Sequence, residues 1–311
     1  MYRGRVIDWA LLVVPGMIWG ASFLFIAEGL EAVGPTGVTF LRILIGFVTL
    51  SLVPAARRPI LAADRAGTAA LGVLWLAFPL SMFPFAEQHV SSALTGMLNG
   101  ATPLFAAMVA SGIARRLPSP SVLLGLGVGF AGAVIMALPG VGLDEGSSRQ
   151  TFGVLLILAA LVSYGFAINL ARSLQQRNGA LPVIWRALGV ALLLTAPLGL
   201  PAVREAHWSL RPAAALVALG ALGTAIAFVL TATAAGRMGA TRASATTFLM
   251  PVVALILGVV IRHERVAALS VGGAAICLAG AWIIRTAGVR QAQSEHPIAA
   301  ARVSAAASSL P

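Results

Sequence analysis

Long apolar runs fill the sequence and constrain its fold more than any other feature. A bilayer core about 30 Å thick is crossed by roughly 20 apolar residues of helix, and each run approaches that length before charge, proline or glycine ends it. The ten runs are Trp9–Ile26, Val38–Val53, Ala69–Phe85, Ala93–Ile113, Val122–Leu138, Phe152–Leu170, Leu181–Leu200, Ala213–Ala235, Ala243–Ile261 and Ala267–Ile284. With 59% hydrophobic and 10% charged residues, the chain is too apolar for a water-soluble domain. The sequence predicts an all-α integral membrane protein with ten transmembrane helices.

The charge pattern indicates orientation in a membrane rather than binding to nucleic acid. The net charge is +11 and no lysine occurs, but the arginines stand as singles and pairs at the ends of apolar runs. With the N-terminus inside, most arginines fall in inner loops and tails, whereas most acids fall outside. We therefore expect two cytoplasmic termini, contact with membrane lipid and no nucleic-acid partner. The abundance of Ala, Gly and Arg is typical of a GC-rich bacterial genome, which predicts the bacterial inner membrane.

Nothing in the sequence indicates a cofactor or a metal. Cys277 is the only cysteine and lies in the last apolar run, so neither a disulfide nor a Cys-based metal site is predicted, and the four histidines are scattered. Arg3 and Arg5 precede the first run as in a signal peptide, but no clear cleavage site follows them. We expect the first helix to be retained.

The second half of the chain repeats the first. Pro251 follows Pro103 by 251 − 103 = 148 residues, and the same offset aligns two Ala-Gly-Ala triplets, 131–133 and 279–281. Because five is an odd number, the two copies of a five-helix unit enter the membrane in opposite senses. Many secondary transporters use such an inverted repeat for alternating access. We predict a first five-helix repeat over residues 1–142, a linker over 143–150, a second repeat over 151–286 and a disordered cytoplasmic tail over 287–311.

Several short motifs make the chain resemble a known family. They are Trp19-Gly20-Ala21-Ser22-Phe23, Phe40-Leu41-Arg42 and the run AEQHVSSALTGMLNGATPLF over residues 86–105, with Tyr164-Gly165, Trp185-Arg186 and Pro251 in the second half. In this order and spacing they resemble an EamA-type member of the drug/metabolite transporter superfamily. The resemblance implies ten helices in two five-helix repeats. It also implies export or exchange of metabolites, amino acids or toxic compounds through a central cavity, and it does not identify the substrate.

Six residues are candidates for binding a substrate near the bilayer midplane, where the first, fourth, sixth and ninth helices are expected to meet. Trp19 and Tyr164 take equivalent deep positions and offer flat apolar surface, although core packing explains them as well. The other candidates offer polar groups, for which interhelical hydrogen bonding is the alternative, and they are Ser22, Asn99, Asn169 and Thr247. Pro103 and Pro251 each remove a backbone hydrogen bond in mid-span and are predicted to kink or hinge their helices.

Five charged or titratable residues are candidates for ion pairing or proton coupling. Arg42 and Arg186 lie inside spans as counterparts in the two repeats, for which a shared structural role is favoured, with Glu28, Glu87 or a lipid phosphate as the partner of Arg42. Glu28, Glu87 and His89 lie near the outer face and are the candidates for proton coupling, although an ordinary solvated loop is the favoured interpretation of Glu87 and His89. Glycines crowd the fifth and tenth runs and predict either close packing of the repeats or a homodimer.

These features favour a secondary transporter, an exporter of small molecules and not an enzyme. A membrane enzyme acting on lipid-linked substrates needs a cluster of catalytic side chains that the sequence does not contain, and the chain has no P-loop for an ATP-driven pump. A membrane sensor remains the alternative. Because no basic cluster is present to neutralise a phosphate, we rank amino acids and hydrophobic metabolites or drugs above nucleotide sugars.

Overall fold

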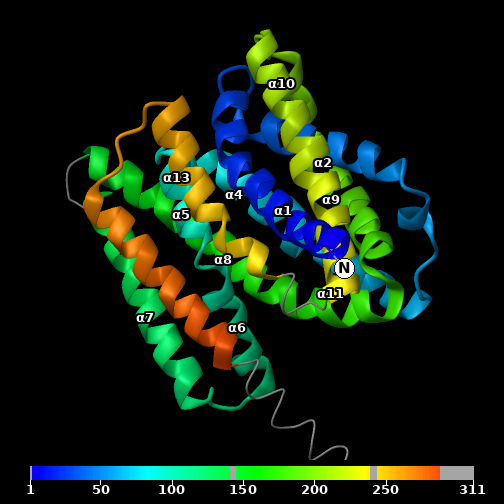
Figure 1. Cartoon of the computed structure of the whole chain (residues 1–311). Coiled ribbons are helices and arrows are strands. Elements are labelled where there is room, and N and C mark those ends of the chain that lie inside the picture. The colour runs from blue at the N-terminus through cyan, green and yellow to red at the C-terminus, as the bar shows by residue number, and fades with distance from the viewer. Residues whose placement is uncertain (1, 141–144, 239–243, 288–311) are drawn as a thin grey trace, which may run out of the picture.

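The computed structural model describes residues 2–140, 145–238 and 244–287, and all regular structure within these ranges is helical (Figure 1). The first half contains α1 (Tyr2–Gly29), α2 (Pro35–Ser51), α3 (Arg65–Leu71), α4 (Phe78–Ala86), α5 (Ser92–Asn99), α6 (Thr102–Ala114) and α7 (Pro120–Ala137), the 3-10 turns η1 (Pro54–Arg57), η2 (Ala62–Asp64) and η4 (Leu138–Gly140), and the π-helical turn η3 (Gly72–Ala77). The second half contains α8 (Glu145–Asn178), α9 (Ala180–Arg204), α10 (Leu210–Ala218), the π-helical turn η5 (Leu219–Ile226), α11 (Ala227–Met238), the 3-10 turn η6 (Ser244–Phe248), α13 (Met250–Ile261) and a last helix, Ala268–Ala287.

The apolar runs form helices as predicted, and most of them are long enough to cross a membrane. Within the described residues the eight long apolar segments are Ile7–Gly29, Ala62–Ala86, Ser92–Ala114, Pro120–Ala137, Ser148–Asn178, Ala180–Arg204, Leu210–Arg237 and Ala268–Ala287. The second and ninth predicted spans form shorter apolar helices, Pro35–Ser51 and Thr246–Ile261. The all-helical membrane fold is thus confirmed, whereas the count of ten spanning helices stays a prediction.

Helix boundaries follow local chemistry. Pro35 and Pro120 stand in the first turns of α2 and α7, where the missing backbone N–H costs nothing. The Ser91 hydroxyl accepts a hydrogen bond from the Leu94 backbone N–H and caps α5. Gly179 joins α8 to α9 with a φ of 80°, a conformation that favours glycine.

Two pairs of segments depart from regular α-helix at matching places in the two halves. The fourth predicted span is broken between α5 and α6 just before Pro103, and the ninth changes from η6 to α13 just before Pro251. The third and eighth spans contain η3 and η5, whose first residues are 219 − 72 = 147 positions apart. These departures recur at almost the offset that aligns the sequence motifs.

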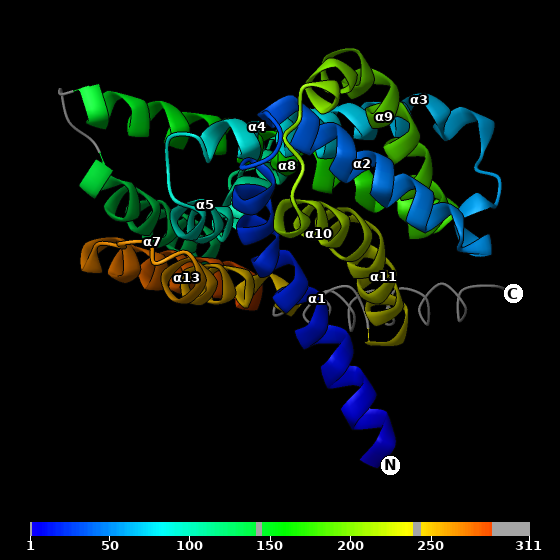
Figure 2. The ribbon, with the colours of Figure 1, turned by 90° about the horizontal axis from the view of Figure 1, so that it is seen from above.

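The helices form two groups with a central set between them. In Figure 1, α5, α6, α7 and α13 lie on one side, α2, α9, α10 and α11 lie on the other, and α1, α4 and α8 run between them, an arrangement that Figure 2 shows from above. Contacts agree with this view, because α1 packs against α13 and α5 on one side and against α10 and α11 on the other. The central helices therefore join the two groups.

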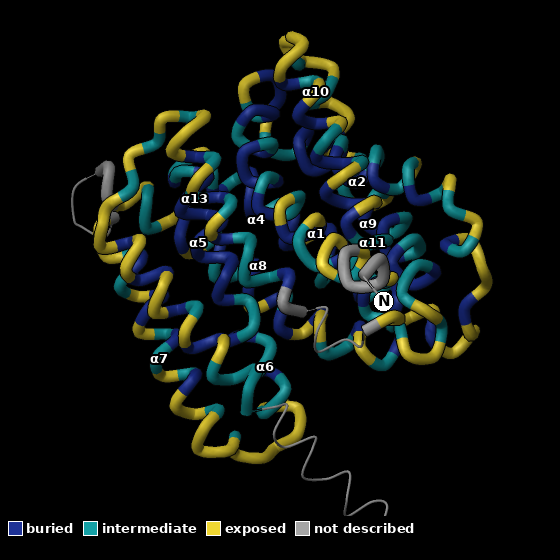
Figure 3. Tube along the Cα trace, in the orientation of Figure 1, coloured by how far each residue is buried: buried dark blue, intermediate teal, exposed yellow. Residues whose placement is uncertain are grey.

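Burial is arranged as expected for a protein in lipid. Buried residues concentrate in the central helices, and exposed residues cover the outer surfaces (Figure 3). Large apolar side chains stand on those surfaces, among them Ile113, Leu193, Leu198 and Val260, each more than 60% exposed. Exposing this much apolar surface to water is unfavourable, whereas contact of the same surface with lipid is favourable.

Glycine allows α7 and the last helix to pack backbone against backbone. A side chain at Gly132 would collide with the Cys277 backbone, and one at Gly280 would collide with the Gly129 backbone. The Ser270 hydroxyl donates to the Met136 carbonyl across the same seam at 2.8 Å. The predicted glycine-rich pair of spans thus packs within one chain.

Parts of two predictions fall outside the described residues. Of the predicted linker 143–150, residues 143 and 144 lie outside them and the rest begins α8. The predicted tail lies outside them from residue 288 onward.

Candidate functional site

A cavity of about 170 Å³ lies at the centre of the bundle. This cavity has room for on the order of a dozen water molecules. Its lining comes from α1 (Trp19, Ser22, Phe23), α2 (Arg42), η3 (Trp75, Leu76), α4 (Leu80, Phe83), α5 and α6 (Asn99, Thr102), α8 (Tyr164, Ile168), η5 and α11 (Gly223, Thr224, Phe228), and η6 and α13 (Thr247, Met250). The four spans predicted to form the site all contribute, together with the second, third and eighth.

Aromatic rings form much of the cavity wall. Phe228 meets Trp19 and Trp75 edge to face, with ring centroids 5.6 and 5.5 Å away. Phe83 lies 5.7 Å from Phe23 and 5.9 Å from Tyr164, again between ring centroids. Contacts between the rings limit their motion, so the wall offers a preformed apolar surface.

The Trp19 indole also has a polar contact that fixes it. Its Nε1 donates to the Gly223 carbonyl at 2.9 Å. Gly223 belongs to η5, and a π-helical turn exposes carbonyl groups that an α-helix would pair internally. This hydrogen bond connects the first and eighth predicted spans at the cavity.

The break before Pro103 places Asn99 in the cavity wall. Pro103 has no N–H, so the carbonyl four residues earlier, that of Asn99, loses its helical partner. The Thr102 hydroxyl donates to that carbonyl at 2.6 Å, and the Asn99 side chain faces the cavity. Thr247 stands four residues before Pro251 and also lines the cavity, so the two prolines act at equivalent places.

Five of the six predicted binding residues line the cavity, namely Trp19, Ser22, Asn99, Tyr164 and Thr247. The Ser22 hydroxyl donates to the Ile18 carbonyl of its own helix at 3.0 Å, so it is partly occupied. Asn169 is not among the lining residues. Its Nδ2 donates to the carbonyls of Ala106 and Gly165 at 3.0 and 2.8 Å, which ties α8 to α6.

The two arginines predicted as counterparts have different surroundings. Arg42 is buried in the cavity wall, and its Nε donates to the Thr224 hydroxyl at 3.1 Å. It forms no ion pair with Glu28 or Glu87 in the described structure. Arg186 is half-buried, lies over the Trp185 ring and donates to the Pro182 carbonyl.

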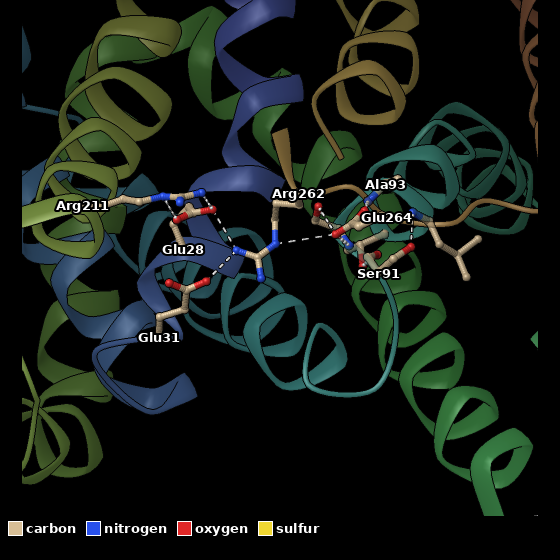
Figure 4. A network of polar contacts seen from close by, with 10 residues as sticks. Glu28, Glu31, Ser91, Ala93, Arg211, Arg262 and Glu264 are labelled. Carbon is tan, nitrogen blue, oxygen red and sulfur yellow. Dashed lines mark hydrogen bonds and ion pairs between the residues drawn. The ribbon is translucent and has the colours of Figure 1, made fainter. Parts of the chain in front are cut away.

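Glu28 belongs to a polar network at one end of the bundle, where α1 ends and α10 begins (Figure 4). We call this the α10 end. Arg211 donates to Glu28 at 2.7 Å, and Arg262 contacts both Glu28 at 2.8 Å and Glu31 at 2.9 Å. Glu264 accepts hydrogen bonds from the backbone N–H groups of residues 92 and 93, where the partial positive charge of the α5 N-terminus favours an anion. The network joins α1 and α10 to the ends of α13 and α5.

Glu87 and His89 lie at the same end, after α4. Both carboxyl oxygens of Glu87 are shielded from solvent without a hydrogen-bond partner in the described residues, so it is not an ordinary solvated loop residue. The His89 ring meets the Phe152 ring edge to face, with centroids 5.5 Å apart.

Sequence reasoning missed the residues contributed by the π-helical turns. Trp75 and Thr224 lie in apolar runs whose pattern does not distinguish a π-helix from an α-helix. The repeat offset could have pointed to both turns, because it aligns the third span, which contains η3, with the eighth span, which contains η5. In the sequence, only charge distinguishes Arg262 and Glu264, and charge alone does not predict the network that they form.

Comparison with known proteins identifies the family. The model of the EamA-like transporter family matches residues 8–138 and again residues 151–286. The chain is 29% identical to a probable terminal-alkyne amino-acid exporter of Streptantibioticus cattleyicolor over 92% of this chain and 96% of the relative. It is 20% identical to an uncharacterized transporter of Archaeoglobus fulgidus, covering 89% and 98%, and 25% identical to the uncharacterized transporter YoaV of Bacillus subtilis, covering 85% and 91%.

A solved structure shows the same fold. It matches with a TM-score of 0.61 at 20% identity and covers 92% of this chain and 97% of its own. The relatives are described as transporters and not as enzymes. This multi-pass membrane protein therefore belongs to the EamA-like transporter family.

Proposed function

We propose that this protein is a secondary transporter that exports small amphipathic molecules through its central cavity by alternating access. The observation that carries the proposal is one cavity lined by corresponding residues from both halves of the chain. Trp19 and Asn99 come from the first half, and Tyr164 and Thr247 come from the second. Inverted repeats create such a site at their interface near the bilayer midplane.

The interruptions of the helices support this proposal. Breaks before Pro103 and Pro251 and the turns η3 and η5 interrupt the helices in the segments that line the cavity. Irregular backbone at membrane depth is tolerated where it is buried in protein or lines a cavity. Two inverted five-helix repeats that rock against each other explain why the interruptions come in pairs.

The chemistry of the wall favours a solute with an apolar body and few polar groups. Aromatic rings from four helices provide flat apolar surface, and Asn99 and Thr247 provide polar contacts. The small cavity suits amino acids and hydrophobic metabolites or drugs better than nucleotide sugars. The similarity to an amino-acid exporter agrees with this range and with export as the direction.

The test is transport by the purified protein in liposomes, with a panel of amino acids and amphipathic toxic analogues. We expect Trp19→Ala, Asn99→Ala and Tyr164→Ala each to lower transport about tenfold or more, because each removes a contact worth at least roughly 1.4 kcal/mol in a desolvated site. Trp208→Ala is the matched control, since Trp208 is 50% exposed between α9 and α10.

Two outcomes would contradict the proposal. Wild-type affinity and rate in all three cavity variants would exclude the cavity as the substrate site. Movement of no solute by wild-type protein in sealed vesicles would favour a sensor over a transporter.

A further inference from the structure

Arg42 carries a charge that nothing in its surroundings directly neutralises. The residue is 7% exposed and sits within a membrane span, where a buried guanidinium is costly. No carboxylate in the described structure lies within ion-pair distance of it. Glu28 pairs with Arg211 and Arg262, and Glu87 acts on Arg42 only through longer-range electrostatics, without a hydrogen bond or an ion pair. Among the described residues that line the cavity, Arg42 is the only charged one.

A hydrogen bond occupies one edge of the Arg42 guanidinium, and the residue lines the cavity. Nε donates to the Thr224 hydroxyl at 3.1 Å, and that hydroxyl donates in turn to the Leu219 carbonyl at 3.2 Å. Leu219 lies five residues before Thr224, so the π-helical turn η5 holds the hydroxyl in place. Nη1 and Nη2 have no hydrogen-bond partner among the described residues, yet neither is sealed off from the cavity.

Arg186 shows what a merely structural arginine looks like in the same chain. It stacks over the Trp185 ring, 5.3 Å from the centroid, and its Nη1 donates to the Pro182 carbonyl at 3.2 Å. It does not line the cavity. The structural role expected for both arginines fits Arg186 and leaves Arg42 unexplained.

We propose that Arg42 is the anion-binding residue of the cavity and that the transported molecules carry a free carboxylate. The carboxylate docks on the Nη1–Nη2 edge, where two parallel hydrogen bonds are geometrically favoured, and the apolar part of the molecule lies against the aromatic wall. This inference rests on the proposed function of the cavity as the transport site. A single arginine matches one carboxylate, whereas a phosphate ester would leave charge unpaired in this wall.

The experiment compares acids with their amides, which have the same shape but no charge on the carbonyl group. Binding to the purified full-length protein is measured for L-leucine and L-leucinamide, L-phenylalanine and L-phenylalaninamide, and 4-phenylbutanoate and 4-phenylbutanamide. We expect at least one acid to bind about tenfold more tightly than its amide, the size expected for a charge-assisted pair. Arg42→Gln should lower the affinity for the acid about tenfold more than the affinity for its amide, and so remove that preference.

Two further variants keep the test decisive if Arg42→Gln folds poorly. Thr224→Val keeps the shape of the side chain but removes the hydroxyl that positions Arg42, so the acid-to-amide ratio should fall. Arg186→Gln is the matched control and should keep the ratio of the wild type.

The inference is overturned if no acid is preferred over its amide in the wild type, or if Arg42→Gln or Thr224→Val retains the preference. These outcomes leave the proposed transport function standing if solutes still cross the liposome membrane. Failure of transport itself appears separately, as the absence of movement of every solute in the panel.

Discussion

Glu87 is a carboxylic acid that the fold shields from water without giving it a hydrogen-bond partner in the described residues. It lies just beyond the Ala62–Ala86 segment. Burial raises the pKa of Glu87 well above its ordinary value, the neighbouring Glu264 carboxylate raises it further, and Arg262 and Arg42 act in the opposite direction. Glu87 therefore takes up a proton more readily in the folded protein than in the unfolded chain.

This shift makes a prediction about stability and pH. A carboxyl whose folded pKa is raised contributes stability below its unfolded pKa, and that contribution is lost as pH rises through the folded pKa, at a rate of at most about 1.4 kcal/mol per pH unit. Glu87→Gln lacks this loss, so its unfolding temperature should rise relative to wild type from about pH 5 upward. Thermal unfolding in detergent across this range measures the difference.

Glu205→Gln is the control, because Glu205 is exposed on the same end of the bundle and should follow the wild-type curve. A difference between Glu87→Gln and wild type that does not change with pH would show that Glu87 is ionised in the folded protein.

At the residue scale, the sequence located the cavity residues better than it assigned their roles. A deep aromatic or amide in a membrane span has few alternatives to packing or binding, so Trp19 and Asn99 were identifiable. The roles of arginines depend on neighbours that are distant in sequence. Arg42 meets Thr224 across 182 positions, whereas Arg186 meets Trp185 and Pro182 in its own helix, and no spacing rule separates these cases.

At the scale of helices, the sequence predicts the breaks at prolines but not the π-helical turns. A proline removes a hydrogen bond wherever it stands in a helix, so the breaks before Pro103 and Pro251 follow from the sequence. The turns η3 and η5 depend on one extra residue accommodated by packing, which leaves the apolar pattern unchanged.

The seam between α7 and the last helix gives a prediction at this scale. Gly132 packs against the Cys277 backbone, whereas Gly127 in the same helix has no atom within 4 Å of an added side-chain carbon. Gly132→Ala should destabilise the protein by about 1 to 3 kcal/mol, because backbone cannot yield as a side chain does. Gly127→Ala should be neutral or stabilising by up to about 1 kcal/mol, the helix preference of alanine over glycine.

Unfolding of both variants in detergent compares the two effects directly. Equal stability of Gly132→Ala and Gly127→Ala would mean that the two helices do not pack as closely as the structure has them.

At the scale of the whole molecule, the alternating access that we propose requires the α10 end to open and close. Arg262 follows α13 on one side of the bundle, and Glu28 connects it through Arg211 to α10 on the other. Glu28 lies nine residues beyond Trp19, or about 14 Å along α1, so the network stands between the cavity and this end. A carboxylate shared by two arginines is suited to hold the end closed and to release it when the contacts break.

Arg262→Gln should therefore shift the protein toward the state in which the α10 end is open. The loss of about 1 kcal/mol of ion pairing changes a two-state equilibrium about fivefold. A cysteine at Ser22, in the cavity wall, reports the change after the native buried Cys277 is replaced by alanine. Its reaction with a membrane-impermeant thiol reagent applied from the α10 side should become about fivefold faster in Arg262→Gln.

A second cysteine at the exposed Trp208 establishes which side of the membrane the α10 end faces, and the arginine distribution predicts the outside. Arg204→Gln is the matched control and should leave the labelling rate unchanged, since Arg204 is exposed at the same end and is not part of the ion pairs that form the network. An unchanged or slower rate in Arg262→Gln would mean that the network does not hold the α10 end closed. The pathway would then have to open by separation of helices elsewhere, with Glu28 and its arginines serving only to fix the ends of α1, α10 and α13.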